Sequence, residues 1–179
     1  TSGIVCAPIT ADNARRLRLD PMVAHNDSNH TTAFTVSIDY KPGMTTGISA
    51  ADRAKTIQAA VAADAKPSDI VQPGHVFPVM ARPGGVLTRA GHTEAGCDLG
   101  ALTGLTPSAV ICEIMKEDGT MARLPDLIGF AERHGLKIGT IADLIAYRSA
   151  HESMVERVGQ QRVQTVVGEL DLIVYRDRA

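Results

Sequence analysis

Tryptophan is absent from this 179-residue sequence, and aromatic residues make up only 3% of it. Proteins that stack bases or sugars on side chains need aromatic faces, so the composition argues against a stacking platform. A strong charge excess is also missing, because 18 basic residues oppose 20 acidic ones and leave a formal net charge of −2. This balance gives no electrostatic reason to expect binding to nucleic acid or to an anionic membrane surface.

Long apolar runs are absent as well, so nothing in the sequence predicts a membrane span, and no segment resembles a signal peptide. The three cysteines, Cys6, Cys97 and Cys112, cannot all pair, and buried free thiols in a reducing compartment are expected. Hydrophobic residues amount to 44%, which argues against disorder. A soluble, cytoplasmic, globular domain is therefore the expectation.

What the sequence does contain is an alternation of β-branched apolar runs with helical patterns, typical of a mixed α/β or α+β layer fold. Strands are predicted over residues 3–9, 31–39, 108–115 and 137–141, and a terminal hairpin over 161–176. Helices are predicted over 10–18, from Ser49 to before Pro67, from near Thr93, over 125–134 and over 142–158.

Closely spaced prolines and glycines interrupt the stretch from Pro73 to Leu87. Because proline cannot donate a ladder hydrogen bond, this stretch is predicted to be an edge strand with tight turns. Farther upstream, Ser49 to Asp52 resembles a capping box, with aspartate in place of the usual glutamate or glutamine.

The densest group of chemically useful residues is Leu87–Glu94, with the sequence LTRAGHTE. Arg89 offers a planar fork for a phosphate or carboxylate, and Gly91 allows close backbone approach. Thr93 stands at a predicted helix N-terminus, where free N–H groups attract anions, and His92 suits a metal or a proton. The alternative is a solvated loop in which Thr93 is only a helix cap.

Two further residues suggest proton transfer. Glu113 lies in the apolar run AVICEIM, where burial would raise its pKa; the alternative is an edge strand that leaves it in water. His75 follows Pro73 and Gly74 at a rigid turn, and it is either a placed acid or base or a satisfied turn residue. From the turn alone, the second interpretation is favoured.

Taken in order, several motifs of this sequence resemble those of the 3,4-dihydroxy-2-butanone 4-phosphate synthases of riboflavin biosynthesis. They are SGIVC (2–6), FTVS (34–37), TTGISAADR (45–53), PGHVFP (73–78), PGGVLTRAGHTEA (83–95), CE (112–113) and DGTMA (118–122). The resemblance runs from residue 2 to about residue 148.

This resemblance implies an α+β fold with a mixed sheet and helices packed around it. It also implies a cytoplasmic homodimer that uses Mg²⁺ or Mn²⁺, with active sites at the subunit interface. Such enzymes convert ribulose 5-phosphate to 3,4-dihydroxy-2-butanone 4-phosphate and formate by way of an enediol, and they bind neither nucleic acid nor membranes.

The resemblance also assigns roles by position. Glu113 and His75 match the essential catalytic residues, and His92 matches a metal ligand. The residues that match substrate-binding positions are Arg89, Ala90, Gly91, His92, Thr93, Glu113, Thr46 and Cys6.

The sequence departs from the family in two places. An acidic segment of the type Asp-x-Glu-x-Glu-Gly-Asp, which supplies a metal-binding carboxylate in the family, has no match here. The alternative function is therefore a catalytically inactive homologue or truncated subunit that acts as a dimer partner. Residues 1–148 form the expected synthase domain. Residues 149–179 resemble a linker and the start of a degenerate GTP cyclohydrolase II segment; since no cysteine follows Cys112, no cyclohydrolase activity is expected.

Overall fold

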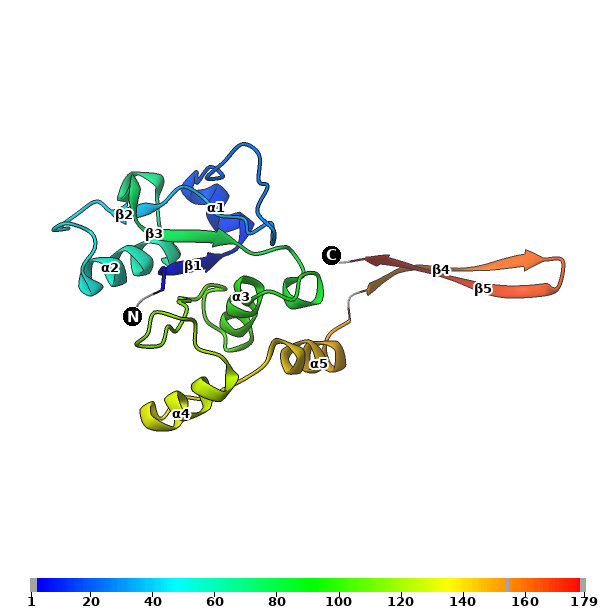
Figure 1. Ribbon diagram of the computed structural model, residues 1–179. Helices are drawn as coiled ribbons and strands as arrows, with labels where there is room; N and C mark the ends of the chain where they lie inside the picture. The colour runs from blue at the N-terminus through cyan, green and yellow to red at the C-terminus, as the bar shows by residue number, and fades with distance from the viewer. Residues whose placement is uncertain (1–2, 154, 178–179) are drawn as a thin grey trace.

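A computed structural model describes residues 3–153 and 155–177 of the chain (Figure 1). The strands are β1 (Cys6–Ile9), β2 (Ile38–Tyr40), β3 (Ile70–Met80), β4 (Val155–Thr165) and β5 (Gly168–Asp177). The α-helices are α1 (Ala11–Leu17), α2 (Ala50–Val61), α3 (His92–Leu102), α4 (Leu124–His134) and α5 (Ile141–His151). Short 3-10 helices occupy Pro67–Asp69 and Gly85–Leu87. The elements confirm an α+β fold.

The main sheet has the strand order β1-β3-β2 and is mixed. Strand β1 runs parallel to β3, with Cys6 opposite Phe77 and Ile9 opposite Met80. Strand β2 runs antiparallel to β3, and its register shifts between Ile38 and Asp39. His75 lies next to this shift.

The hydrophobic core lies between this sheet and helices α1 and α2. Fully buried side chains include Ile9 of β1, Leu17 of α1, Ile38 of β2 and Val76 of β3. Burying each such side chain stabilises the fold by roughly 1.5–3 kcal/mol. Helix α2 packs against β2 and β3, whereas α3 packs against β1.

The helix ends follow the sequence signals closely. Thr10 Oγ1 accepts the N–H of Asn13 at the start of α1, and Ser49 Oγ accepts the N–H of Asp52 at the start of α2. Gly135 ends α4 in the left-handed conformation at φ 62°. Only one of the two hydrogen bonds of the capping box expected at α2 is formed, because the Asp52 carboxylate accepts from Thr45 and Gly47 instead of from the Ser49 backbone.

The prediction of an edge strand over the proline-rich stretch was wrong. Strand β3 is central in the three-stranded sheet, although it contains Pro73 and Pro78. Pro73 falls within the register shift, where no ladder bond is needed. The Pro78 carbonyl accepts the N–H of Thr35, and the missing proline N–H faces a segment that forms only isolated bridges.

Several other boundaries differ from prediction; for example, β1 begins at Cys6 and α2 ends at Val61. Residues 31–37 and 108–115 form isolated bridges rather than strands, and 137–140 is irregular. The last helix ends at His151 instead of residue 158, because β4 begins at Val155. The hairpin is confirmed and is longer than expected.

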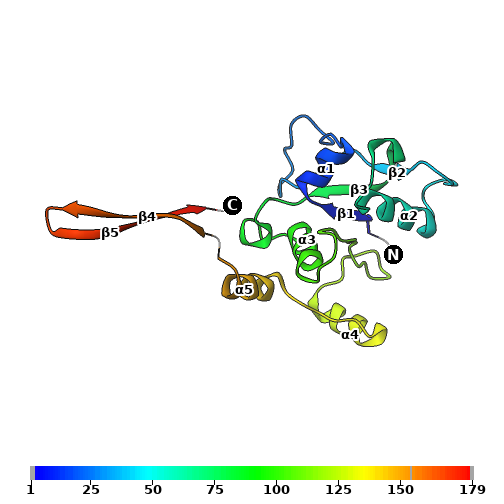
Figure 2. The ribbon, with the colours of Figure 1, turned by 180° about the vertical axis from the view of Figure 1, so that it is seen from behind.

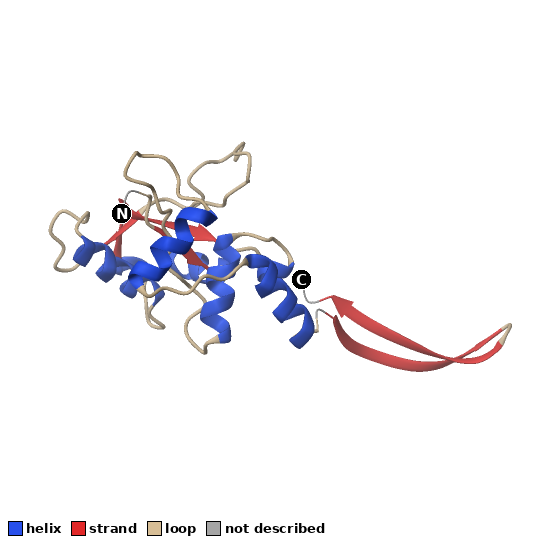
Figure 3. Ribbon diagram, turned by 60° about the horizontal axis from the view of Figure 1, so that its bottom comes forward, coloured by secondary structure: helices blue, strands red, loops and turns tan. Residues whose placement is uncertain are grey.

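Strands β4 and β5 form a two-stranded ribbon that extends away from the rest of the protein (Figures 2 and 3). Its side chains are exposed along most of its length. Among the described helices, none is both long and apolar enough to span a membrane.

Candidate functional site

His75 lies in β3 beside Asp39 of β2, next to the register shift between the two strands. The ring Nδ1 of His75 lies 2.7 Å from Asp39 Oδ2, and the backbone N–H of His75 donates to Asp39 Oδ1 at 3.0 Å. The Asp39 side chain is 12% exposed and that of His75 is 42% exposed. A buried carboxylate therefore holds a histidine whose ring still reaches the surface.

Thr46 belongs to a loop that packs onto this pair. Its neighbour Gly47 has a left-handed φ of 85°, and a Cβ there would come within 2.6 Å of His75 Nδ1. Asp52 of α2 holds the loop, because its Oδ2 accepts the Thr45 hydroxyl at 2.5 Å and the Gly47 N–H at 3.2 Å. These hydrogen bonds, chiefly that of Thr45, lower the pKa of Asp52.

Glu113 lies near Cys6, on the edge of β1 that faces away from β3. Cys6 exchanges two backbone hydrogen bonds with Ile111, each 3.0 Å long, and a Cβ on Gly3 would come within 2.7 Å of Glu113 Oε2. Burial, followed by the nearby charge of Glu113, raises the pKa of Cys6 to about 11. The thiol is therefore neutral at ordinary pH.

Strand β1 separates Glu113 from His75. The Phe77 N–H donates to Val5 O on one side of β1, and Ile111 pairs with Cys6 on the other. Glu113 and His75 therefore belong to segments that lie on opposite sides of β1, roughly two strand spacings or 10 Å apart. Glu113 is exposed in the single chain, although residues 108–115 form isolated bridges rather than the edge strand that the exposed interpretation assumed.

The segment from Arg89 to Thr93 forms the turn that enters α3. Gly91 is the N-cap residue, so the first N–H groups of α3 lack partners within the helix. Thr93 is buried at 6% exposure, whereas His92 and Ala90 are exposed. The loop thus presents a helix N-terminus beside a guanidinium group.

The buried side chain of Glu94 holds this loop in place. It is 1% exposed, and its Oε2 accepts Arg89 Nη1 at 2.6 Å while its Oε1 accepts the Arg82 N–H at 2.9 Å. A Cβ on Gly91 would come within 2.5 Å of Glu94 Oε2. Arg89 Nη2 also donates to the His30 carbonyl at 3.2 Å, so its guanidinium is held in one place.

Three acidic residues that hold the site, Asp39, Asp52 and Glu94, were missed as site residues by the sequence reasoning. Asp52 and Glu94 stand inside the motifs TTGISAADR and PGGVLTRAGHTEA, whereas Asp39 lies two residues beyond FTVS. Their side chains bind functional loops from inside the protein, a role that spacing alone does not reveal.

No metal centre is formed by the described residues themselves: they contain no group of three or more His, Cys, Asp or Glu side chains that could hold an ion. His92 has no carboxylate partner in this part of the chain. Mg²⁺ prefers oxygen ligands, so His92 does not make a magnesium site by itself.

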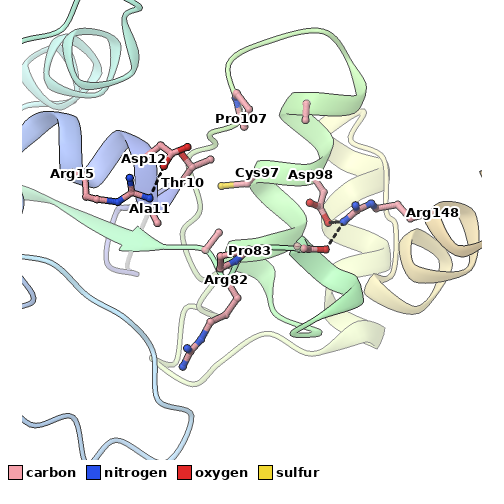
Figure 4. Close-up of a pocket in the computed structure, with 14 residues that line it drawn as sticks. Thr10, Ala11, Asp12, Arg15, Arg82, Pro83, Cys97, Asp98, Pro107 and Arg148 are labelled. Atoms are coloured by element: carbon pink, nitrogen blue, oxygen red, sulfur yellow. Dashed lines mark hydrogen bonds and ion pairs between the residues drawn. The ribbon is translucent and has the colours of Figure 1, made fainter. Parts of the chain in front are cut away.

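A separate cavity of about 490 Å³ is lined by residues of α1, α3 and α5 and by the loop of residues 81–85 (Figure 4). It contains none of the residues that the sequence marked as functional. Arg148 of α5 lines it and binds Asp98 Oδ2 at 2.8 Å and the Gly84 carbonyl at 2.9 Å. These bonds attach α5 to the loop that leads to Arg89.

The chain is similar to known proteins over nearly its whole length. A family model described as 3,4-dihydroxy-2-butanone 4-phosphate synthase matches residues 1–147. The chain is 58% identical over 175 residues to the protein of that name from Pseudomonas aeruginosa, covering 98% of this chain and 48% of the relative. It is 56% identical over 178 residues to a riboflavin biosynthesis protein of Aquifex aeolicus, covering 98% of this chain and 44% of the relative. The chain thus spans about half the length of the curated relatives it matches.

Two solved structures are also similar. A two-domain 3,4-dihydroxy-2-butanone 4-phosphate synthase from A. baumannii has 59% identity and a TM-score of 0.86, over 98% of this chain and 52% of that one. A synthase of the same name, in complex with two magnesium ions, has 44% identity and a TM-score of 0.79, over 84% of this chain and 75% of that one.

Proposed function

The chain belongs to the 3,4-dihydroxy-2-butanone 4-phosphate synthase family, and we propose that it catalyses the reaction which gives the family its name. In this reaction ribulose 5-phosphate yields 3,4-dihydroxy-2-butanone 4-phosphate and formate, a step of riboflavin biosynthesis. The observation that carries the proposal is the Arg89–Thr93 loop at the start of α3, fixed by Glu94.

This loop binds the substrate phosphate. Arg89 supplies a guanidinium that a buried carboxylate holds in place, and the N-terminus of α3 supplies N–H groups and a favourable dipole. Gly91 leaves room for the Arg89–Glu94 ion pair beside the backbone, while Ala90, His92 and Thr93 complete the turn around the phosphate.

Proton transfer falls to Glu113 and His75. Forming an enediol requires removal of a proton from a carbon next to a carbonyl and delivery of a proton to oxygen. The two side chains come from segments on opposite sides of β1, which suits action at different atoms of one sugar skeleton. Thr46 and the neutral thiol of Cys6 lie close to His75 and Glu113, respectively, where each contacts the substrate.

We extend this proposal to a divalent metal, Mg²⁺ or Mn²⁺, with His92 as one ligand. Support comes from the similar synthase in complex with two magnesium ions. A divalent ion held there would act as a Lewis acid and would make the carbon next to the substrate carbonyl more acidic. Because the described residues offer His92 without carboxylate ligands, the remaining ligands come from outside this set.

The proposal also includes a homodimer with the active site at its interface. Apolar side chains around Glu113 are exposed in the single chain: Val110 is 56%, Ile114 37% and Leu124 59% exposed. A second copy that covers this surface would also enclose Glu113. The three free cysteines are in keeping with a reducing, cytoplasmic location.

We assign residues 1–148 to the synthase domain and residues 149–179 to a separate tail. In support, the family match ends at residue 147, and the β4–β5 ribbon pairs only with itself in the part of the chain that the structure describes.

The test is NMR detection of formate from ribulose 5-phosphate with Mg²⁺. Formate that disappears on addition of EDTA and returns with excess Mg²⁺ supports the proposal. Absence of formate from a folded sample, with a full-length relative as positive control, would contradict it and favour a catalytically inactive subunit.

A further inference from the structure

Asp39 makes two contacts with His75, and together they fix the chemical form of the ring. Its Oδ1 accepts the His75 backbone N–H at 3.0 Å, while its Oδ2 lies 2.7 Å from Nδ1. An ionised carboxylate only accepts hydrogen bonds, so Nδ1 carries the proton. In the neutral ring the lone pair is then on Nε2, the nitrogen that Asp39 does not touch.

From this geometry we infer that Asp39 is a positioning residue, which holds His75 as the Nδ1–H tautomer and presents Nε2 as the proton-accepting atom. This inference rests on the proposed function for its catalytic consequence but not for the tautomer itself. Asp39 makes no contact with the reacting atoms and acts through His75.

Local structure supports a dedicated arrangement. The register shift between Ile38 and Asp39 leaves Ile38 opposite Val76 and Asp39 opposite Val71, so β3 bulges toward Asp39. Gly74 donates its N–H to Ser37 Oγ at 3.1 Å within this bulge. In this bulge the His75 backbone N–H donates to the Asp39 carboxylate, which also faces the imidazole.

Gly47 covers the contact between the two side chains. Its backbone packs against both Asp39 Oδ2 and His75 Nδ1, and a Cβ would overlap both atoms. The Thr45–Gly47 loop, held by Asp52, therefore limits the water that can reach Nδ1, whereas the His75 side chain as a whole stays 42% exposed. Nδ1 is thus occupied by Asp39 and covered by Gly47, while Nε2 has no hydrogen-bond partner among the described residues.

The first experiment reads the tautomer directly. ¹⁵N-histidine labelling with long-range ¹H–¹⁵N NMR distinguishes Nδ1–H from Nε2–H rings, and His75→Gln assigns the signal among the six histidines. At a pH where the ring is neutral, the wild type is expected to show Nδ1–H. An Nε2–H ring in the wild type would overturn the inference, whether or not the enzyme produces formate.

The second experiment uses Asp39→Asn, Asp39→Glu and a matched control, Ser37→Ala. The amide introduced by Asp39→Asn donates to Nδ1 and moves the ring proton to Nε2, so kcat should fall about 100-fold or more while KM stays within about threefold. Asp39→Glu should restore the Nδ1–H signal and part of kcat.

Ser37→Ala removes a hydrogen bond of the same bulge without touching the imidazole, so it should change Tm but neither the tautomer nor kcat. If Asp39→Asn flips the tautomer and leaves kcat unchanged, or if Ser37→Ala lowers kcat as strongly as Asp39→Asn does, the positioning role is wrong. Absence of formate from the wild type would instead contradict the proposed function and leave the tautomer result intact.

Discussion

The two halves of the molecule are packed very differently. Residues 3–102, the packed half, contain the main sheet, helices α1 to α3 and nearly all the buried side chains; in the open half beyond them, Ala131 is the one buried residue among those described. His75 belongs to the packed half and is held by Asp39, while Glu113 belongs to the open half and is exposed. This difference indicates that the fold of a single chain positions His75, whereas the environment of Glu113 depends on what covers it.

The largest expected effect is a loss of activity on substitution of Glu113 in the open half. Glu113→Gln should lower kcat for formate release by about 10³-fold, because an amide cannot take up the proton that a carboxylate accepts. The free energy of unfolding should hardly change, since the exposed Glu113 side chain makes no hydrogen bond within the described residues. Formate NMR and thermal unfolding by circular dichroism measure the two quantities. A kcat within tenfold of the wild type would remove Glu113 from the mechanism.

A pair of alanine substitutions compares the packing of the two halves directly. Ile9→Ala, at 1% exposure, should lower the free energy of unfolding by about 3 kcal/mol, because it leaves a cavity in the core. Leu105→Ala, at 71% exposure, should change it by no more than about 0.5 kcal/mol. Urea unfolding at low protein concentration measures both.

Equal losses of stability in these two variants would show that Leu105 is as well packed as Ile9 in solution. The contrast between the halves would then have to be abandoned.

How far the sequence predicts this structure depends on whether a feature is local. The caps at Thr10 and Ser49 and the stop at Gly135 are decided by a few neighbouring residues, and the structure confirms them. The central place of β3 was not predictable from its prolines, because it depends on β1 and β2 lying on either side. Likewise, Lys137 to Thr140 has strand propensity but no strand beside it.

The same distinction applies to the site. The order of motifs pointed to His75, Arg89 and Glu113, since each stands in a recognisable local string. The partners that hold two of them, Asp39 for His75 and Glu94 for Arg89, became visible only with the three-dimensional contacts. Asp39 is 36 residues from His75, a separation over which spacing gives no guidance.

A moderate effect is expected at the exposed apolar surface of the open half. Leu124→Asp, at 59% exposure, should raise the dimer dissociation constant at least tenfold and reduce formate release, because a charge would enter the proposed interface. Val166→Asp, in the turn between β4 and β5, is a control on an equally apolar but isolated side chain. Sedimentation velocity over a range of concentrations measures the change. If both variants dimerise like the wild type, Leu124 lies outside the interface.

The smallest expected effect is a difference in alkylation rate between the cysteines of the two halves. Burial and the charge of Glu113 raise the pKa of Cys6 to about 11, since both disfavour the thiolate. At pH 9, two units lower, about 1% of Cys6 is therefore thiolate. Iodoacetamide should alkylate the half-buried Cys112 first and leave Cys6 and Cys97 unmodified at pH 7.5, as measured by mass spectrometry of the native protein.

Raising the pH sharpens this last comparison, because the thiolate fraction of Cys6 grows about tenfold per pH unit up to pH 11 and its alkylation rate should follow. In urea the burial and the contact with Glu113 are lost, so all three cysteines should react at similar rates. Equal rates for Cys6 and Cys112 in the native protein at pH 7.5 would mean that β1 is open to solvent beside Glu113. In that case the packed half would not extend to the site, and the neutral thiol assigned to the substrate contact would be wrong.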